Sequence, residues 1–207
     1  MNKTLNSLLA TLMITGAGQA FAASSVDLTV KGLITPSACE PTLSNGSQVE
    51  IGKISAKDLN VDQPTLLPQQ NLALTVTCDG ATLMALEAKD NRQGSDYNND
   101  LMSFGLGLIN GDEKLGAMEL SLINPLADSV AARTIGSTDG GTTWLMERNF
   151  MRNNIVSVAD ASVDAPIAVQ LFNADMRILP TIAPASGLTL TEEVLIDGSA
   201  TLTVKYL

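Results

Sequence analysis

The sequence predicts an all-β sandwich. Apolar and polar residues alternate in several short runs, which is the pattern of half-buried strands. Turn-forming pairs recur between these runs, where their positive-φ residues suit tight connections. The pairs are Asn45-Gly46, Asp79-Gly80, Asn110-Gly111, Asp139-Gly140 and Asp197-Gly198.

Three runs show the alternation most clearly: residues 26–34, 72–78 and 200–206. In each run the residues between the apolar positions are mostly Thr, Asp or Lys, so one face is predicted to be buried and the other solvated. The predicted inward residues are Val26, Leu28, Val30 and Ile34 in the first run, Leu72, Leu74 and Val76 before Cys78 in the second, and Ala200, Leu202, Val204 and Tyr206 in the third.

Two segments leave alternatives open. Glu147–Val158 could hold a short helix, although its β-branched residues and asparagines favour helices poorly. Leu188, Leu190, Val194 and Ile196 share the parity of the run 200–206. A hairpin with a three-residue Asp197-Gly198-Ser199 connection keeps both runs on one face. One long strand with a bulge at Gly198 does so too.

The N-terminus predicts export. Lys3 precedes the short apolar run Leu8–Ile14, and Ala20-Phe21-Ala22 is an A-x-A cleavage pattern. We therefore expect a signal peptide over residues 1–22 and a single domain over residues 23–207. Neither the signal nor any later run has the roughly 18 apolar residues of a membrane-spanning helix.

In an oxidising compartment, the two cysteines predict one disulfide between Cys39 and Cys78. The bridge would close a loop of about 40 residues, which the chain-entropy estimate values at ~4 kcal/mol. A redox-active pair needs close spacing and an electropositive setting, whereas Glu40 and Asp79 adjoin these thiols.

Composition excludes several functions. The chain has no histidine, so imidazole-based catalysis and metal ligation are absent, and its net charge of −10 disfavours nucleic-acid binding. Asp96-x-Asn98-x-Asp100 begins like a calcium loop, but Leu101 and Gly107 stand where glycine and glutamate are required. We expect a solvated loop over 90–100, close packing within a strand at Gly105-Leu106-Gly107 and a core position for Trp144. No catalytic constellation, cofactor site or metal site is predicted.

The order of these features resembles a known family. Val26–Ile34 leads to Cys39, Cys78 ends an alternating run, and the chain closes on Gly198–Leu207 with a penultimate tyrosine. This pattern resembles subunits of chaperone–usher fimbriae and, more closely, a poorly characterised family of exported proteins encoded in fimbrial operons. Internal stretches that look like the latter are Gly52-Lys53-Ile54, Asp90-Asn91-Arg92, Phe104–Gly107 and Lys114–Ala117.

The resemblance implies an immunoglobulin-like, pilin-type sandwich that lacks its last strand and performs no catalysis. A periplasmic chaperone, the outer-membrane usher and other fimbrial subunits would be its partners, in the periplasm or in a cell-surface fimbrium of a Gram-negative bacterium. Assembly would proceed by β-strand addition. The resemblance implies two strand roles in this sequence. The strand that binds the chaperone or another subunit would contain Ala200, Leu202, Val204 and Tyr206. The donor-like strand would contain Val26, Leu28 and Val30.

Two departures from the pilin pattern leave open a minor or terminal subunit, or a relative that merely shares the fold, and the first of them, with the polar loop Asp90–Asp100, supports an alternative function. Only residues 23–25 precede the first alternating run after the predicted cleavage, and the glycine that pilins place before the C-terminus is absent or displaced to Gly198. The alternative is a self-sufficient periplasmic binding or regulatory protein with the same fold.

Overall fold

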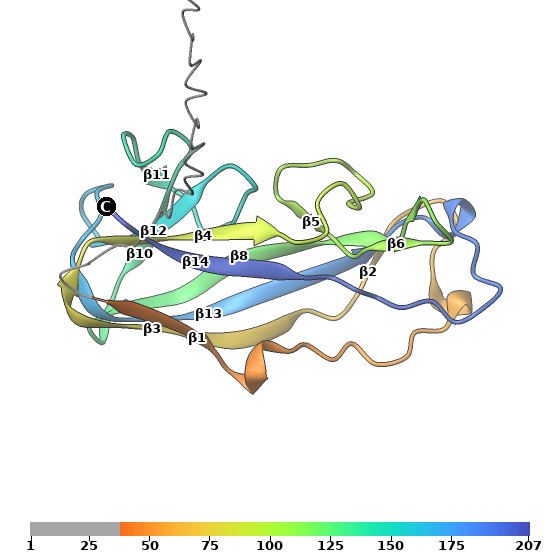
Figure 1. Cartoon of the computed structure of the whole chain (residues 1–207), viewed down its shortest axis with the longest axis horizontal. Coiled ribbons are helices and arrows are strands. Elements are labelled where there is room, and N and C mark those ends of the chain that lie inside the picture. Colours follow the sequence, from red (N-terminus) through yellow and green to blue (C-terminus); the bar gives the residue numbers. More distant parts are fainter. Residues whose placement is uncertain (1–37) are drawn as a thin grey trace, which may run out of the picture. The chain divides into compact units, whose positions relative to one another are not determined.

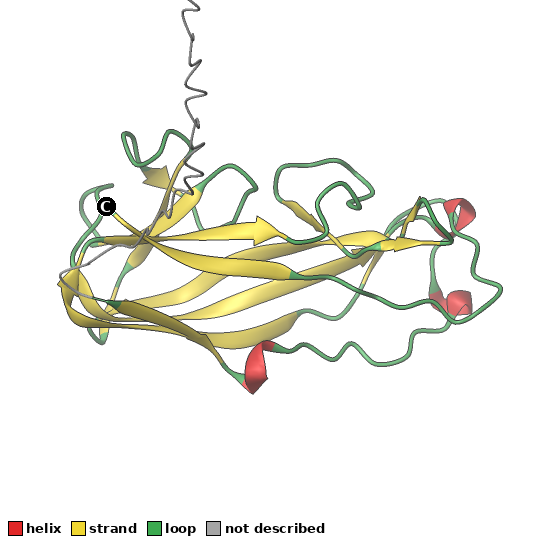
Figure 2. Cartoon of the chain, viewed as in Figure 1, coloured by secondary structure: helices red, strands yellow, loops and turns green. Residues whose placement is uncertain are grey.

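In the computed structural model, residues 38–207 form two antiparallel sheets that pack face to face (Figures 1 and 2). The structure describes residues 38–207. The predicted signal peptide, its cleavage site and the run 26–34 therefore lie outside the described residues. Among the described residues, no helix has the length and apolar character needed to cross a membrane.

The first sheet has the strand order β1-β3-β13-β8-β5, with β2 on β13 and β9 on β8. Its long strands are β3, β13 and β8, and the shorter ones lie along their margins (Figure 1). The bounds are β1 (Cys39–Leu43), β2 (Thr65–Leu66), β3 (Gln70–Thr82), β5 (Ser103–Gly105), β8 (Gly116–Ala127), β9 (Val130–Ala131) and β13 (Val169–Ile182).

The second sheet has the order β11-β10-β12-β4-β14, and β6 and β7 form a separate hairpin. Only three short 3₁₀ turns interrupt the strands among the described residues. The bounds are β4 (Met84–Asp90), β6 (Leu108–Ile109), β7 (Glu113–Lys114), β10 (Arg133–Ser137), β11 (Leu145–Met146), β12 (Ile155–Ala159) and β14 (Ala200–Tyr206), with η1 (Asn45–Ser47), η2 (Ala56–Asp58) and η3 (Ala185–Gly187).

The predicted all-β sandwich is confirmed, and period-two burial explains it. In β3, Leu72, Leu74, Val76 and Cys78 are buried while the residues between them are more exposed. Such a strand removes one apolar face from water, at about 25 cal/mol per Å² of apolar surface, only by packing on a second sheet. The main core between the sheets also contains Met84, Leu86, Phe104, Phe150, Val156, Val158 and Phe172.

The turn predictions are partly right. Asn110-Gly111 connects β6 to β7, with φ of 51° and 102° at the two residues, as expected for a hairpin turn. Asp79-Gly80 was expected as a turn, and this is wrong because β3 continues through both residues to Thr82. Leu83 alone then separates β3 from β4, which belongs to the other sheet.

Neither open segment adopts a predicted alternative. No helix forms over Glu147–Val158, because Val156 and Val158 are buried in the central strand β12. Residues 188–199 form neither a hairpin partner nor an extension of β14, which begins at Ala200. Instead, Leu190, Val194 and Ile196 pack on a second apolar cluster. Its buried residues are Leu67, Leu106, Ile109, Leu115 and Ile182.

The loop over residues 90–100 is not simply solvated, contrary to expectation. Asp96 is fully buried and forms an ion pair with Arg152, with 3.0 Å between Oδ1 and Nη1. The Lys114 ammonium donates a hydrogen bond to the carbonyl of Asp96. A buried carboxylate must be paired to tolerate its loss of water, so this ion pair fixes the loop on the sandwich.

Two packing expectations have opposite outcomes. Close packing is confirmed at Gly105 in β5, because a Cβ there would overlap the Ser95 hydroxyl. The expected strand over all three residues is wrong, because β5 ends at Gly105 and Gly107 has a φ of 94°. Trp144 is not a core residue: it is half-buried, and its indole N–H donates to the carbonyl of Gly141 in the same loop.

Candidate functional site

The candidate site lies between the outer strands of the two sheets. β1 ends the first sheet and pairs with β3, from Cys39 opposite Cys78 to Leu43 opposite Leu74. β14 ends the second sheet and pairs with β4 along its whole length. Within residues 38–207, no strand pairs with the outer edge of either β1 or β14. Each edge therefore leaves backbone N–H and C=O groups free to pair with an added strand.

An apolar groove of about 920 Å³ lies between these edges. Side chains from both sheets line its bottom, and two irregular segments, residues 47–54 and 190–199, form its walls. The groove therefore opens onto the apolar cores of the sandwich. The apolar residues at its bottom are Leu43, Leu72, Leu106, Leu115, Met118, Leu120, Met176, Ile178, Ile182 and Leu202.

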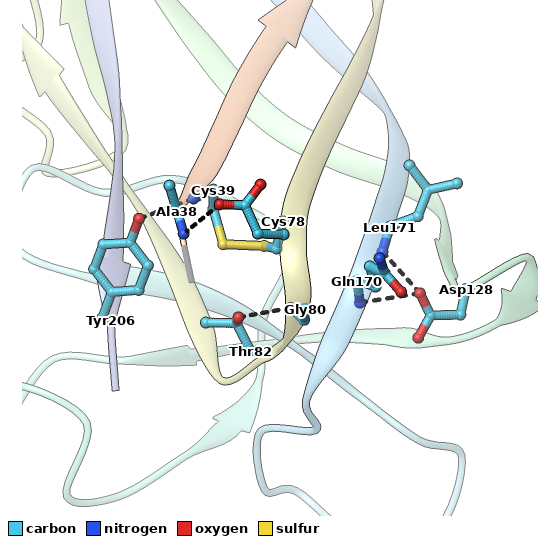
Figure 3. The surroundings of a disulfide bond; sticks show 10 residues. Ala38, Cys39, Cys78, Gly80, Thr82, Asp128, Gln170, Leu171 and Tyr206 are labelled. Carbon is cyan, nitrogen blue, oxygen red and sulfur yellow. Dashed lines mark hydrogen bonds between the residues drawn. A yellow bond between two sulfur atoms is a disulfide. The ribbon is translucent and has the colours of Figure 1, made fainter. Parts of the chain in front are cut away.

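The disulfide closes one end of the groove. The predicted bridge between Cys39 and Cys78 is present and joins β1 to β3 (Figure 3). Beside it, the backbone N–H of Cys39 donates to the Tyr206 hydroxyl of β14 at 2.9 Å. A further pair of hydrogen bonds joins Ala38 to Asp79. Here the two edges are tied together, whereas the hollow begins farther along, at Leu43 and Leu202.

Along β14 the side chains alternate in exposure. Ala200, Leu202 and Val204 are half-buried and pack against the main core, while the intervening residues face solvent. Tyr206 is 44% exposed although its hydroxyl accepts the bond from Cys39. The alternation gives β14 an apolar face directed to the groove side of the core. The role assigned to these residues in binding a partner strand remains a prediction.

One groove wall, residues 188–199, is held by polar contacts at two points. The Glu113 carboxylate accepts the backbone N–H of Thr189 at 2.7 Å, and Asn110 donates to the Thr189 carbonyl. The bond from Thr189, together with one that Asn110 Nδ2 donates to the same carboxylate at 3.0 Å, lowers the pKa of Glu113 below its ordinary value. A wall without regular secondary structure is thus anchored on the β6–β7 hairpin.

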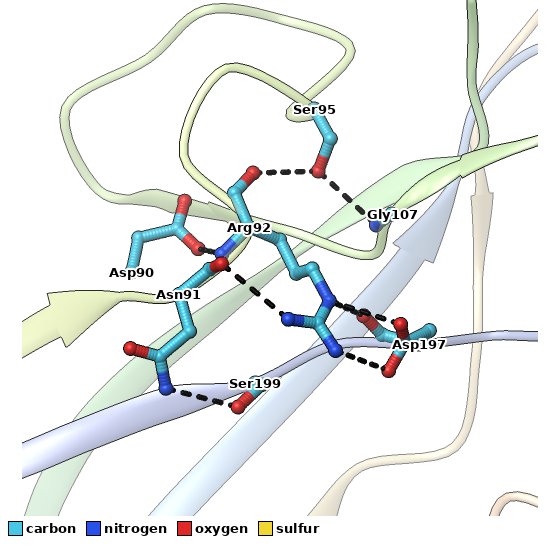
Figure 4. A network of polar contacts seen from close by, with 7 residues as sticks. All are labelled: Asp90, Asn91, Arg92, Ser95, Gly107, Asp197 and Ser199. Atoms are coloured by element: carbon cyan, nitrogen blue, oxygen red, sulfur yellow. Dashed lines mark hydrogen bonds and ion pairs between the residues drawn. The ribbon is translucent and has the colours of Figure 1, made fainter. Parts of the chain in front are cut away.

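The second anchor is the ion pair of Arg92 and Asp197 (Figure 4). The guanidinium donates to both carboxylate oxygens, at 3.0 Å from Nε and 2.8 Å from Nη2, and to the Asp197 carbonyl. This hydrogen-bonded pairing lowers the pKa of Asp197. A bidentate arginine fixes direction as well as distance, so the pair sets where the wall joins β14.

Gly198 follows this anchor and has a steric role. A Cβ at this position would lie 2.7 Å from Leu106 Cδ2 and 3.4 Å from Met118 Sδ. The backbone therefore approaches the bottom of the groove more closely than an L-side chain permits without displacing these two residues. The sequence leaves open whether the pilin glycine is absent or displaced to Gly198, and Gly198 lies in the groove lining.

The charged residues that line the groove are mainly acidic. Glu50, Glu192 and Glu193 line the opening, and the one lysine there, Lys53, lies 3.6 Å from Glu193 in an exposed ion pair. Exposed pairs of this kind contribute little to stability. The groove therefore offers an apolar interior, two backbone edges and an acidic rim, which together suit an extended peptide with alternating apolar side chains.

Sequence reasoning found the strand β14 and the disulfide but missed the groove walls. Val49, Ile51 and Ile54 were a usable signal, because they are apolar residues in a segment with no strand pattern. Nothing in the sequence connects Arg92 to Asp197, which are 105 positions apart. Among residues 38–207, no group of three His, Cys, Asp or Glu residues is arranged to hold a metal ion.

Comparisons with known proteins find similarity to one family and to two proteins of a single organism. Residues 28–103, which include both cysteines, match a family described as "Protein of unknown function (DUF1120)". Two proteins of Escherichia coli (strain K12) are similar over nearly their full length. "Protein GltF" is 26% identical, with 100% of this chain and 98% of that protein aligned. "Uncharacterized protein YhcF" is 24% identical, with 92% and 97% aligned.

Proposed function

We propose that this protein is a non-enzymatic structural or accessory subunit of a chaperone–usher fimbria, exported to the periplasm, that accepts a β-strand from a partner. The periplasmic chaperone would supply this strand first, and another fimbrial subunit would replace it at the usher. The single observation that carries the proposal is the apolar groove between the free edges of β1 and β14.

The geometry supports this proposal in two ways. An added strand between β1 and β14 would gain backbone hydrogen bonds from the free edges and would bury its alternate side chains in the hollow. A hollow that opens onto the core is also costly to leave in water, since each buried CH₂ contributes about 0.8 kcal/mol. Strand binding therefore has both a backbone and an apolar contribution.

The alternative is a self-sufficient periplasmic protein on the same sandwich, and the short segment before the run 26–34 favours it. After the predicted cleavage only residues 23–25 precede the alternating run 26–34, so little chain remains to donate to a neighbour. The two proposals differ in whether a chaperone is required.

Co-expression with the fimbrial chaperone encoded in the same operon tests the main proposal. A tagged full-length chain should retain the chaperone through purification. Leu202→Asp should weaken retention at least tenfold, because a carboxylate in an apolar hollow costs several kcal/mol and about 1.4 kcal/mol corresponds to a tenfold change. Thr203→Asp is the matched control, since Thr203 is exposed on the same strand.

The proposal fails if the full-length chain folds as a stable monomer and never retains the chaperone. It also fails if both variants retain the chaperone equally while Leu202→Asp keeps its fold, measured by circular dichroism. Retention that Thr203→Asp abolishes and Leu202→Asp preserves would place the contact outside the groove.

A further inference from the structure

We propose that the buried ion pair of Asp96 and Arg152, which lies outside the groove lining, positions the wall of the strand-binding groove. The pair would act through the turn at residues 91–94. This turn carries Arg92, which binds Asp197 in the wall. The inference rests on the proposed function only where partner binding is measured.

The carboxylate of the pair is more completely buried than its contacts explain. Asp96 has no exposed surface, and the partner of its side chain is Arg152 Nη1, at 3.0 Å from Oδ1. The second oxygen, Oδ2, is buried without a hydrogen-bond partner among the described residues. Apolar residues of similar size are often as stable in such a place, because a buried ion pair must recover the cost of losing water. Stability alone therefore does not explain the pair, whereas a role in fixing position does.

Arg152 holds the loop between β4 and β5 at three points. Besides binding Asp96, its guanidinium donates from Nη2 to the Asp100 carbonyl at 2.9 Å, and its backbone N–H donates to the Leu101 carbonyl at 2.9 Å. Lys114 of β7 donates to the Asp96 carbonyl at 3.0 Å. Since Arg152 belongs to the connection between β11 and β12, the loop is fixed both to this connection and to the β6–β7 hairpin.

One turn of the chain connects Asp96 to Arg92. Ser95 closes this turn, because its backbone N–H and its hydroxyl both donate to the Arg92 carbonyl, at 3.0 and 2.7 Å. The same hydroxyl accepts the N–H of Gly107 at 3.1 Å (Figure 4). β5 packs directly behind the turn: a Cβ on Gly105 would overlap the Ser95 hydroxyl and lie 2.6 Å from the Arg92 carbonyl oxygen. A displacement of Asp96 is therefore expected to displace Arg92.

The turn contacts the wall where the wall joins β14 (Figure 4). Next to the bidentate contact of Arg92 with Asp197, the backbone N–H of Asn91 donates to the Ser199 carbonyl at 3.0 Å. The side-chain amide of Asn91 donates to the Ser199 hydroxyl, also at 3.0 Å. From β5, the Leu106 carbonyl accepts the N–H of Asp197 at 3.0 Å. The chain that follows β4 thus determines where this part of the wall lies.

Apolar replacement of the buried pair separates positioning from stability. In the full-length chain, Asp96→Leu combined with Arg152→Met (the apolar variant) should leave the midpoint of thermal unfolding unchanged or raise it. The N–H of Asp197 should nevertheless exchange with solvent at least about fivefold faster, the lower end of typical couplings between linked sites. The N–H of Thr189, which Glu113 holds at the other anchor, should exchange at its wild-type rate. NMR measures both rates residue by residue.

A second ion pair provides the matched control. Arg133 and Asp164 also lie 3.0 Å apart, between Nη1 and Oδ1, at the start of β10. Arg133→Met combined with Asp164→Leu (the control variant) removes the same two charged groups from another site. The control variant should leave the exchange of the Asp197 N–H unchanged.

Two further variants test the route from the pair to the wall. Ser95→Ala keeps the buried pair but removes the hydroxyl that joins Arg92 to Gly107, so the Asp197 N–H should again exchange faster. Arg92→Gln removes the last contact of the route. Combined with the apolar variant, Arg92→Gln should accelerate exchange by clearly less than the product of the separate factors, because both changes release the same contact.

The positioning role is overturned if the Asp197 N–H exchanges at its wild-type rate in Ser95→Ala and in the apolar variant with its fold intact. It is also overturned if the N–H of Thr189 is accelerated equally, because the whole protein would then be loosened. If the apolar variant does not fold, Ser95→Ala decides the outcome.

Chaperone retention, which rests on the proposed function, shows whether the position of the wall matters for strand binding. The apolar variant should retain at least about fivefold less chaperone than the control variant. Equal retention by the two variants overturns the role in strand binding. If the wild type never retains the chaperone, the fimbrial proposal fails, while the exchange rates still decide whether Asp96 and Arg152 position the wall.

Discussion

The two ends of the groove differ in how they are held. At the closed end, one covalent bond and a short backbone-to-tyrosine hydrogen bond tie β1, β3 and β14 together. At the open end, irregular walls depend on a few side chains, chiefly Glu113, Arg92 and Asp197. The closed end is held covalently. The open end is held only by non-covalent contacts, namely these polar anchors and the packing of Leu190, Val194 and Ile196 on the second apolar cluster, so it is the part that can adjust to a strand.

The largest loss of stability is expected from a change at the closed end. Replacing Cys39 and Cys78 with serine removes a bridge between residues 39 positions apart, which the chain-entropy estimate values at about 4 kcal/mol. The midpoint of thermal unfolding should fall by about 10 °C. Calorimetry of oxidised, reduced and doubly substituted protein measures this shift.

The reduced wild type should behave like the double variant, which serves as the control for the substitution itself. Equal midpoints for oxidised and reduced protein would contradict the view that the covalent bond holds the closed end.

A smaller effect is expected at the open end. Gly198→Val places its Cβ against Leu106 and Met118, so the wall must move or these side chains must leave their positions. Overpacking of this kind costs about 1–3 kcal/mol. Strand binding should weaken as well, because the added side chain enters the groove. Chemical denaturation and chaperone retention measure the two effects.

Gly187→Ala is the matched control, because no atom lies within 4 Å of its Cβ position. It should change stability by less than about 0.5 kcal/mol. If Gly198→Val is equally neutral, the open end is looser than its close approach to Leu106 indicates.

The two ends also differ in how well their structure could be predicted from the sequence. The disulfide could be predicted from the export signal and the presence of two cysteines. Strands β3 and β14 could be predicted from the alternation of apolar and polar residues. Strand β13 alternates too, but Pro180 argues against a central strand. In the structure the Pro180 carbonyl accepts the N–H of Leu67, so this position still pairs on its acceptor side.

The open end carried no comparable local signal. Residues 190–199 share the parity of β14, which favoured a strand. They follow a different course because Leu190, Val194 and Ile196, which are half-buried, pack against residues distant in sequence, such as Leu67 and Leu115. The anchor between Arg92 and Asp197 depends on the same tertiary arrangement. Long-range packing decides these features, so they could not be predicted from spacing.

The smallest expected effect is a pH dependence of protein stability that comes from two carboxylates at the open end. The pKa values of Glu113 and Asp197 are lowered in the folded protein, so both carboxylates favour folding while ionised. Their contribution is complete above their ordinary pKa values, 4.5 and 3.8, and is lost as the pH falls through the lowered values. Stability should therefore begin to fall below about pH 4.5.

Glu113→Gln and Asp197→Asn should each make this decline shallower, measured by denaturant titrations between pH 3 and 7. Asp160 is a control at another site: its pKa is lowered by Ser162 and by backbone N–H groups in its own turn. Asp160→Asn should also make the decline in stability shallower.

Binding of a fluorescent dye that recognises exposed apolar surface tests the groove wall itself. Glu113→Gln should increase dye binding at neutral pH, because an amide holds the Thr189 N–H less strongly than a carboxylate. Asp160→Asn should leave dye binding unchanged. Equal dye binding for the two variants would mean that the wall at the open end does not depend on its Glu113 anchor.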